Sequence, residues 1–150
     1  MLQLPVELRL VGGMNNSEGR VEVRYHGIWG TVCDDDFVAS AATVICRSLG
    51  FGGPAQAKKD GFFGPGEGQI WLDQLHCTGN ETGIGECMHS HWGEHNCEHS
   101  EDAAVICTPG DVHQSSVSSE IAACSKLLQP SPHSFLISVH WKQNVPMQCH

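Results

Sequence analysis

Short stretches in which apolar and polar residues alternate indicate that much of the chain forms strands. In the segment 20–24, the two valines fall on one face, and Arg20, Glu22 and Arg24 fall on the other. This alternation is the pattern of a half-buried strand. A turn at His26-Gly27 ends it, and apolar stretches predict further short strands at 27–33, 69–73 and 103–107.

One helix is predicted between these strands. The segment 40–50 (SAATVICRSLG) repeats apolar residues at helical spacing, with Ser40 as the N-cap and Gly50 as the glycine that ends the helix. The glycine-rich span 51–68 that follows shows few regular signals. One helix beside several short strands predicts an α+β domain whose core is too small to be stable without cross-links.

Glycine and charge divide the chain into two parts. All 17 glycines lie between Gly12 and Gly110, and the segment 8–108 carries a net charge of −8 out of −9 for the whole chain. We therefore predict a domain at 8–108 and a mostly irregular tail of unknown role at 109–150. The tail begins Ser-rich and later contains the apolar run SFLISVHW (134–141), whose exposure would favour aggregation.

The cysteines point to an oxidising compartment. Six of the eight lie in the predicted domain, and no C-x-x-C pair suggests a zinc ribbon. Spacing alone leaves every pairing of these six open. In the tail, Cys124 and Cys149 are free to pair with each other or with another chain. Sequons at Asn15 and Asn80 predict glycosylation and agree with a secretory route.

The ends and the charge of the chain narrow the class of protein. No apolar run is long enough to span a membrane. The first residues lack the layout of a signal peptide, so a secreted form would be represented here by a fragment or mature piece. The acidic balance disfavours a dedicated nucleic-acid partner, which needs a basic face.

No catalytic constellation stands out, so we predict that the chain is not an enzyme. The segments His91–His95 and His95–His99 match H-x-x-E-H, a zinc-protease motif that needs a helix. Gly93 and Cys97 interrupt that helix. Phosphate-binding loops and nucleophile elbows are missing from the sequence. For Trp29 and Trp71 we expect a packing role.

Six segments match, in order, the motifs of one known family. They are LRLVGG (8–13), GRVEV (19–23), WGTVCDDDF (29–37), VICRSLGF (44–51), FGPGEGQIWLDQLHCTGNE (63–81) and CEHSEDAAVIC (97–107). Together they resemble a scavenger receptor cysteine-rich (SRCR) domain of the type with three disulfides. This resemblance implies a curved β-sheet that cradles one α-helix. It also implies three bridges, Cys33–Cys97, Cys46–Cys107 and Cys77–Cys87.

The acidic residues predict a cation site. Asp34-Asp35-Asp36 follows Cys33, and Glu101-Asp102 follows Cys97, so the implied bridge would bring the two acidic runs together. Converging carboxylates favour Ca²⁺, with Mg²⁺ as the alternative. The resemblance implies Asp34, Asp35 and Glu101 as calcium ligands, and Asp73 and Asn96 as part of a second site. Ala41 stands where the family often has an Asp, which weakens the case for that second site.

The resemblance implies an extracellular ligand-binding module, either secreted or part of the ectodomain of a membrane protein, that recognises polyanionic or protein ligands. A partly coordinated cation would accept a sulfate, phosphate or carboxylate of the ligand. Arg20 and Arg24, together with Arg9, are the candidates for direct contact with an anion. Two alternatives remain open: a non-catalytic accessory domain of a secreted enzyme of the lysyl oxidase-like or serine protease type, and a truncated splice product. The oligomeric state is not predicted.

Overall fold

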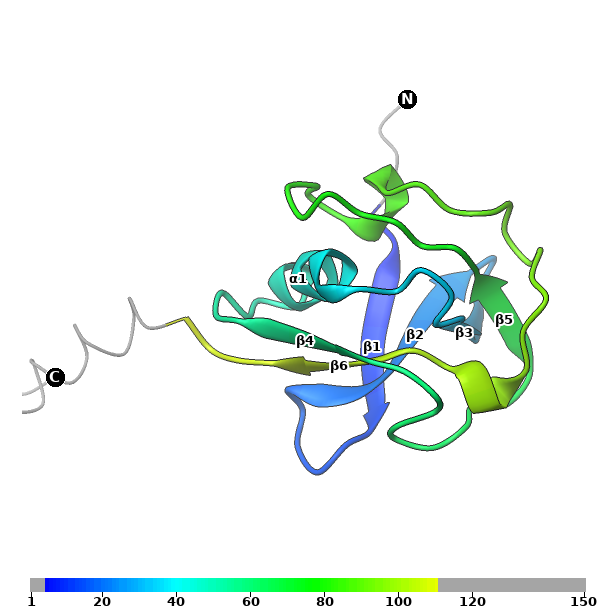
Figure 1. The fold of residues 1–150 in the computed structure, drawn as a ribbon, viewed down its shortest axis with the longest axis horizontal. Helices are drawn as coiled ribbons and strands as arrows, with labels where there is room; N and C mark the ends of the chain where they lie inside the picture. Colours follow the sequence, from blue (N-terminus) through cyan, green and yellow to red (C-terminus); the bar gives the residue numbers. More distant parts are fainter. Residues whose placement is uncertain (1–4, 111–150) are drawn as a thin grey trace, which may run out of the picture. The chain divides into compact units, whose positions relative to one another are not determined.

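The computed structural model describes residues 5–110, so the predicted tail lies outside the described residues except for its first two, and Cys124 and Cys149 lie outside them too (Figure 1). Within this part, the chain forms six strands, one α-helix and two short 3-10 helices. The strands are β1 (Glu7–Gly12), β2 (Glu18–Tyr25), β3 (Ile28–Val32), β4 (Ala55–Lys58), β5 (Gln69–Leu72) and β6 (Ala104–Cys107). The helices are α1 (Ala39–Ser48), η1 (Ile84–Glu86) and η2 (His99–Glu101).

All six strands belong to one sheet in which β2 is central. Along one edge, β2 pairs with β1; along the other, it pairs with β3 and β6. The path β4-β6-β2-β3-β5 is antiparallel except between β3 and β5, which run parallel. The sheet curls around α1, as the resemblance implied (Figure 1). The predicted fold class, a small α+β domain with three disulfides, is confirmed.

The helix α1 matches the predicted segment but begins differently. Its N-cap is Val38 rather than Ser40, and no side chain caps it, so the prediction for Ser40 is wrong. Just upstream of this N-cap, Phe37 is fully buried. The C-terminus follows the prediction, because Gly50 adopts φ 94 and donates to the Arg47 carbonyl at 3.0 Å. Phe51 donates to the Cys46 carbonyl at 2.9 Å, which completes a Schellman motif.

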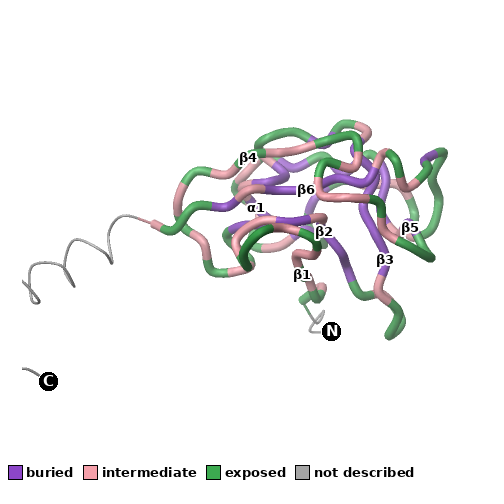
Figure 2. Tube along the Cα trace, turned by 90° about the horizontal axis from the view of Figure 1, so that it is seen from below, coloured by how far each residue is buried: buried purple, intermediate pink, exposed green. Residues whose placement is uncertain are grey.

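The core fills the space between α1 and the concave face of the sheet. Its fully buried side chains come from β2, β3, β5, β6 and α1 and from the loops between them (Figure 2). The largest of them are Phe37, Ile45, Leu72, Leu75 and Ile84. Between residues 5 and 110, no helix is both long and apolar enough to cross a bilayer.

Three disulfides cross-link this small core, with the pairing that the resemblance implied. Cys33–Cys97 and Cys46–Cys107 join positions 64 and 61 residues apart, whereas Cys77–Cys87 joins positions only 10 apart. The first bridge ties the end of β3 to the segment before η2. That contact decides where the acidic residues lie.

Candidate cation site

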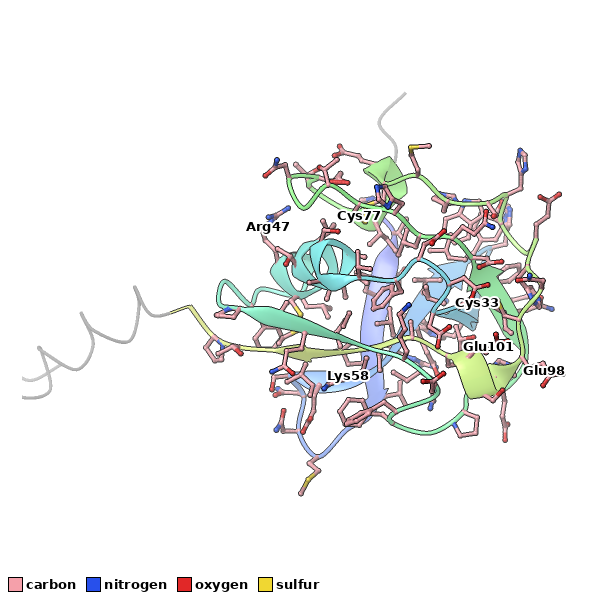
Figure 3. All side chains as sticks on the ribbon, viewed as in Figure 1. Cys33, Arg47, Lys58, Cys77, Glu98 and Glu101 are labelled. Atoms are coloured by element: carbon pink, nitrogen blue, oxygen red, sulfur yellow. A yellow bond between two sulfur atoms is a disulfide. The ribbon has the colours of Figure 1, made fainter. Side chains whose placement is uncertain are left out.

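The end of β3 and the 3-10 helix η2 are held together by backbone and covalent contacts. Cys33 forms an isolated antiparallel bridge with Asp102, and the Asp34 amide donates to the Glu101 carbonyl at 2.9 Å. The disulfide Cys33–Cys97 adds a covalent link between the same two segments. Cys33 and Glu101 therefore lie on the same side of the domain, away from Cys77 (Figure 3). The predicted approach of the two acidic runs is present.

One carboxylate oxygen from each of Asp34, Asp35 and Glu101 lies within 4.8 Å of the other two. Asp34 is only 6% exposed, and its Oδ2 accepts the Asp60 amide at 2.7 Å. Glu101 accepts the Glu98 amide at 2.8 Å in the capping box of η2. These bonds fix two of the three carboxylates and leave each of them with acceptor capacity for a further ligand.

The electrostatics of Asp35 reflect this crowding of negative charge. Burial raises the pKa of Asp35 above its ordinary value, and the neighbouring carboxylates of Asp73, Glu101, Asp34 and Asp36 raise it further. Within the described residues, no salt bridge reaches Asp34, Asp35 or Glu101. The negative charge of the cluster is therefore not compensated by a basic side chain.

Asp73 and Asn96, the residues of the predicted second site, lie on the other side of Asp35. Asp73 is 4% exposed, and one of its carboxylate oxygens lies within 4.8 Å of one from Asp35. With its amide nitrogen turned toward them, Asn96 donates to Asp35 at 3.1 Å and to Asp73 at 3.3 Å. In the opposite orientation, its amide oxygen faces both carboxylates. Ala41 is buried in α1 and contributes no oxygen.

The donor set suits a hard cation. Carboxylate oxygens are the ligands that Ca²⁺ and Mg²⁺ prefer. Cys33 and Cys97 also approach Asp35 and Asp73, but both sulfurs are in a disulfide and offer no thiolate for zinc. Asp34, Asp35 and Glu101 would hold the ion, and Asp73 would add negative charge beside it.

Arg20 lies in a charged cluster on the outer face of the sheet and is largely occupied there. The side chain of Glu22 is 8% exposed and accepts from Arg9 at 2.6 Å and from Arg20 at 2.8 Å. Burial alone would raise the pKa of Glu22, but the bonds from both arginines outweigh it and lower this pKa. Arg20 is 11% exposed and also donates to the Gly64 carbonyl at 3.0 Å.

The other two arginines are more accessible. Arg9 is 46% exposed and lies over the Trp29 ring at 4.2 Å, and Arg24 is 44% exposed and pairs with Glu7 at 3.3 Å. Arg9 and Arg24 are therefore better placed than Arg20 to contact an anion.

Sequence reasoning missed the contact between a buried carboxylate, Asp102, and the partly exposed His99, next to the acidic cluster. Asp102 is fully buried and accepts the Gly66 amide at 2.7 Å and His99 Nδ1 at 2.9 Å. The second ring nitrogen of His99 lies 3.0 Å from the Gly68 carbonyl, so both nitrogens face acceptors. Burial lowers the pKa of His99, but its bonds to Asp102 and Gly68 prevail and raise it. No local pattern signals the contact with Gly68, because 31 residues separate it from His99.

The remaining candidate residues are the two sequons, the histidine motifs and the tryptophans. Asn15 and Asn80 are both exposed in turns. The segments 91–95 and 95–99 run through turn and irregular backbone up to His99, the first residue of η2, and Gly93 has φ 83. Trp29 and Trp71 are half-buried, and Trp71 donates to the Ile28 carbonyl at 2.9 Å.

An aromatic cluster on Tyr25 was also missed by sequence reasoning. Trp92 stacks on the Tyr25 ring with centroids 4.3 Å apart, and Trp71 meets the same ring edge-on at 5.1 Å. Both tryptophans therefore have packing roles.

Comparison with known proteins bears on both the fold and the site. The model of the scavenger receptor cysteine-rich domain family matches residues 11–108. Lysyl oxidase homolog 4 from Bos taurus is 48% identical over 118 residues, which is 78% of this chain. The chain spans only 16% of the length of that relative.

Two solved structures are similar over most of the described part. The third SRCR domain of murine neurotrypsin is 50% identical, with a TM-score of 0.65, and the match covers 71% of this chain and 99% of that domain. The SRCR domain of mouse MARCO, solved in a dimeric form, is 46% identical, with a TM-score of 0.58 over 67% of this chain and 93% of the other.

Proposed function

The chain belongs to the scavenger receptor cysteine-rich domain family, and from that premise we propose that it binds anionic ligands with the help of a calcium ion at Asp34, Asp35 and Glu101. Domains of this family are extracellular, non-catalytic binding modules. The proposal adds the ion, the ligand chemistry and the residues. Protein ligands that carry clustered acidic or sulfated groups belong to the same class.

The observation that supports the ion is the convergence of three carboxylates without a basic partner. Like charges this close repel one another; burial raises the pKa of Asp35, and the neighbouring carboxylates raise it further. A divalent cation would relieve it and use the free acceptor positions of Asp34 and Glu101. Sites of this kind on extracellular modules bind calcium weakly, with Kd on the order of 10⁻⁴ to 10⁻³ M.

The ion would also explain how an acidic domain holds an anion. The segment 8–108 carries a net charge of −8, which repels a polyanion in bulk. A cation held by three protein carboxylates keeps open coordination positions, because Ca²⁺ accepts six to eight oxygen ligands. Sulfate, phosphate or carboxylate oxygens of the ligand would fill these positions.

Binding of the oxidised chain to immobilised dextran sulfate tests the proposal. We expect binding in millimolar CaCl₂ that is lost in EDTA and lost in Asp35→Ala at any calcium concentration. Glu94→Ala, which removes an exposed acid in the turn before Asn96, is the matched control and should bind as the parent does. Equal binding with and without calcium, or full binding by Asp35→Ala, would contradict the proposal.

The similarity to lysyl oxidase homolog 4 favours a second candidate, in which this domain is an accessory module of a larger secreted enzyme. The cation site would then serve to hold a ligand for a catalytic domain elsewhere in the protein. Sequencing the complete transcript discriminates the two. An oxidase domain in the same reading frame would support the accessory role, and its absence from the complete frame would leave the independent binding module.

A further inference from the structure

Strand β1 has one edge that makes no backbone hydrogen bond to any other described segment. Its other edge pairs along its whole length with β2, from Glu7 opposite Arg24 to Gly12 opposite Gly19. No other strand pairs with β1, and no further backbone hydrogen bond within residues 5–110 involves the residues of β1. The amide and carbonyl groups along this edge can therefore accept another strand.

The two faces of β1 differ in chemistry. Leu8 and Leu10 lie opposite Val23 and Val21 of β2 and pack against the core, together with Val6. Glu7 and Arg9 alternate with them on the outer face. A strand that pairs with the free edge must therefore present apolar residues inward and charged residues outward, because directly opposite residues share a face.

A second copy of β1, running antiparallel, meets this requirement in one register. With Leu8 opposite Leu8 of the second copy, Glu7 lies opposite Arg9 and Arg9 opposite Glu7. Centring the pair on residue 7 or 9 instead places like charges opposite each other, which is unfavourable. Centring it on Leu10 leaves both charged residues without a charged partner. The sequence of the strand is thus complementary to itself in only one of these registers.

In that register, the charge pattern of the sheet continues across both copies. Arg9 already pairs with Glu22 of β2, and Glu7 pairs with Arg24. A row of directly opposite side chains on the outer face would then cross four strands. It would contain Glu22 and Arg9 of one copy, followed by Glu7 and Arg24 of the second copy. Negative and positive charges therefore alternate over four strands, and the two-fold symmetry produces the same row twice.

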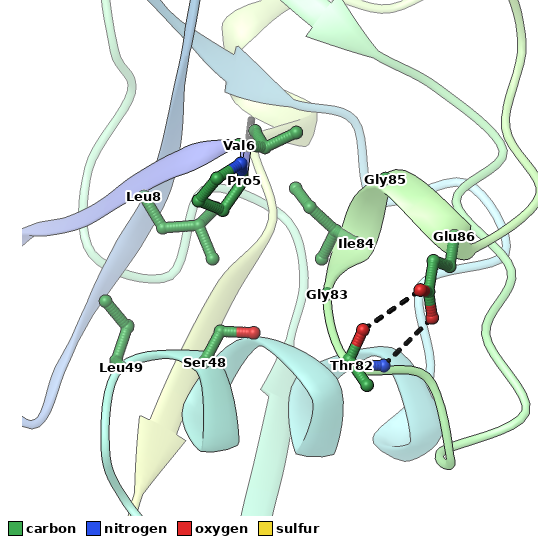
Figure 4. Close-up of a pocket in the computed structure, with 10 residues that line it drawn as sticks. All are labelled: Pro5, Val6, Leu8, Ser48, Leu49, Thr82, Gly83, Ile84, Gly85 and Glu86. Carbon is green, nitrogen blue, oxygen red and sulfur yellow. Dashed lines mark hydrogen bonds between the residues drawn. The ribbon is translucent and has the colours of Figure 1, made fainter. Parts of the chain in front are cut away.

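The inner face offers a pocket of mixed apolar and polar lining beside the same strand. Figure 4 shows it between the start of β1, the end of α1 and η1, lined by Val6, Leu8, Leu49 and Ile84 among others. Its volume is about 410 Å³. The inward Leu8 and Leu10 of a second copy would extend the apolar layer over this side of the domain.

We propose that two copies of this chain associate through antiparallel pairing of their β1 edges, centred on Leu8. One strand from each copy gives a small contact, so the dimer is weak and transient. It would place two cation sites on one particle, which raises the avidity for a polymeric ligand. The pairing itself does not depend on the cation.

Sedimentation equilibrium of the oxidised 150-residue chain, with EDTA present, tests the pairing. Glu7→Arg places an arginine at position 7 opposite Arg9 of the other copy, and Arg9→Glu places a glutamate at position 9 opposite Glu7 of the other copy. Because like charges then face each other in both rows, each variant alone should dimerise roughly 30-fold more weakly than the parent. An equimolar mixture restores opposite charges in both rows and should recover the parental dissociation constant. Glu94→Arg, which makes the same charge change away from β1, should dimerise as the parent does.

A second measurement covers the case in which Arg9→Glu, which also loses its bonds to Glu22, fails to fold. Amide hydrogen exchange of the parent should slow with rising protein concentration at the β1 amides that face away from β2. Recovery by the mixture, or this concentration-dependent protection, supports the pairing. A parent chain that stays monomeric at its highest soluble concentration, or a dimer that neither charge reversal weakens, would overturn it.

Discussion

Removing the disulfide Cys33–Cys97 is expected to affect both the stability of the domain and the cation site. This bridge closes a loop of 64 residues and joins the residue before Asp34 to the segment before Glu101. The double variant Cys33→Ala with Cys97→Ala deletes it and leaves no unpaired thiol behind. The matched control is Cys77→Ala with Cys87→Ala, which deletes a bridge of separation 10 on another side of the domain.

The magnitudes follow from the entropy of loop closure in the unfolded chain. Opening the 64-residue loop should cost about 4 kcal/mol of unfolding free energy, and opening the 10-residue loop about 3 kcal/mol. The net stability of a typical domain is about 5–15 kcal/mol, so each variant can remain folded but with little reserve. Backbone bonds such as that between Asp34 and Glu101 still hold the acidic runs together in the folded variant.

Urea unfolding, followed by tryptophan fluorescence and repeated in the presence of calcium, measures both effects. We expect the larger loss of stability in the Cys33/Cys97 variant, together with weaker calcium binding. The Cys77/Cys87 variant should lose stability yet bind calcium as the parent does. A loss below about 1 kcal/mol for the long loop, or equal weakening of calcium binding in both variants, would refute the reasoning.

Two further substitutions test the charged residues around the sheet. Glu22→Gln should lower the unfolding free energy by about 2 kcal/mol, because it weakens the bonds to Arg9 and Arg20. Since the pKa of Glu22 is lowered on folding, this difference should be constant above pH 4.5 and shrink as the pH falls below it, which urea titrations at pH 3–7 would show. His99→Gln should destabilise the domain most below pH 6.5, where His99 is charged beside Asp102. Since folding raises the pKa of His99, the difference in unfolding free energy between the parent and His99→Gln should decrease as the pH rises through that higher pKa. A difference in unfolding free energy that grows with pH would contradict this.

Local pattern was sufficient for the elements whose residues alternate or repeat strongly. The alternation around Val21 and Val23 located β2, and the helical spacing after Ser40 located α1 to within two residues at each end. Strand β4 was missed because its sequence, AQAK, has little strand propensity. It becomes a strand because it pairs with β6, with Ala55 opposite Cys107, a contact between distant parts of the chain. Strand β1 was also missed, although Leu8 and Leu10 alternate there with Glu7 and Arg9.

The chemistry of the site was likewise predictable only in part from the sequence. The acidic runs beside Cys33 and Cys97 are visible in the sequence, and the implied bridge was enough to bring them together. The burial of Glu22 was not predictable, because the alternation of β2 assigns it to the outer face. That face is partly covered by a loop that Arg20 holds through the Gly64 carbonyl. The contact of Asp102 with Gly66 and that of His99 with Gly68 likewise depend on that loop.

Calorimetric titration of the oxidised chain with calcium tests the cation site most directly, with Asp35→Ala and Glu94→Ala measured beside it. The account predicts saturable binding with Kd on the order of 10⁻⁴ to 10⁻³ M in the parent and in Glu94→Ala. It predicts no saturable heat in Asp35→Ala, provided that its circular dichroism spectrum shows a folded domain. No heat in the parent, or equal heat in a folded Asp35→Ala protein, would contradict a calcium ion at Asp34, Asp35 and Glu101.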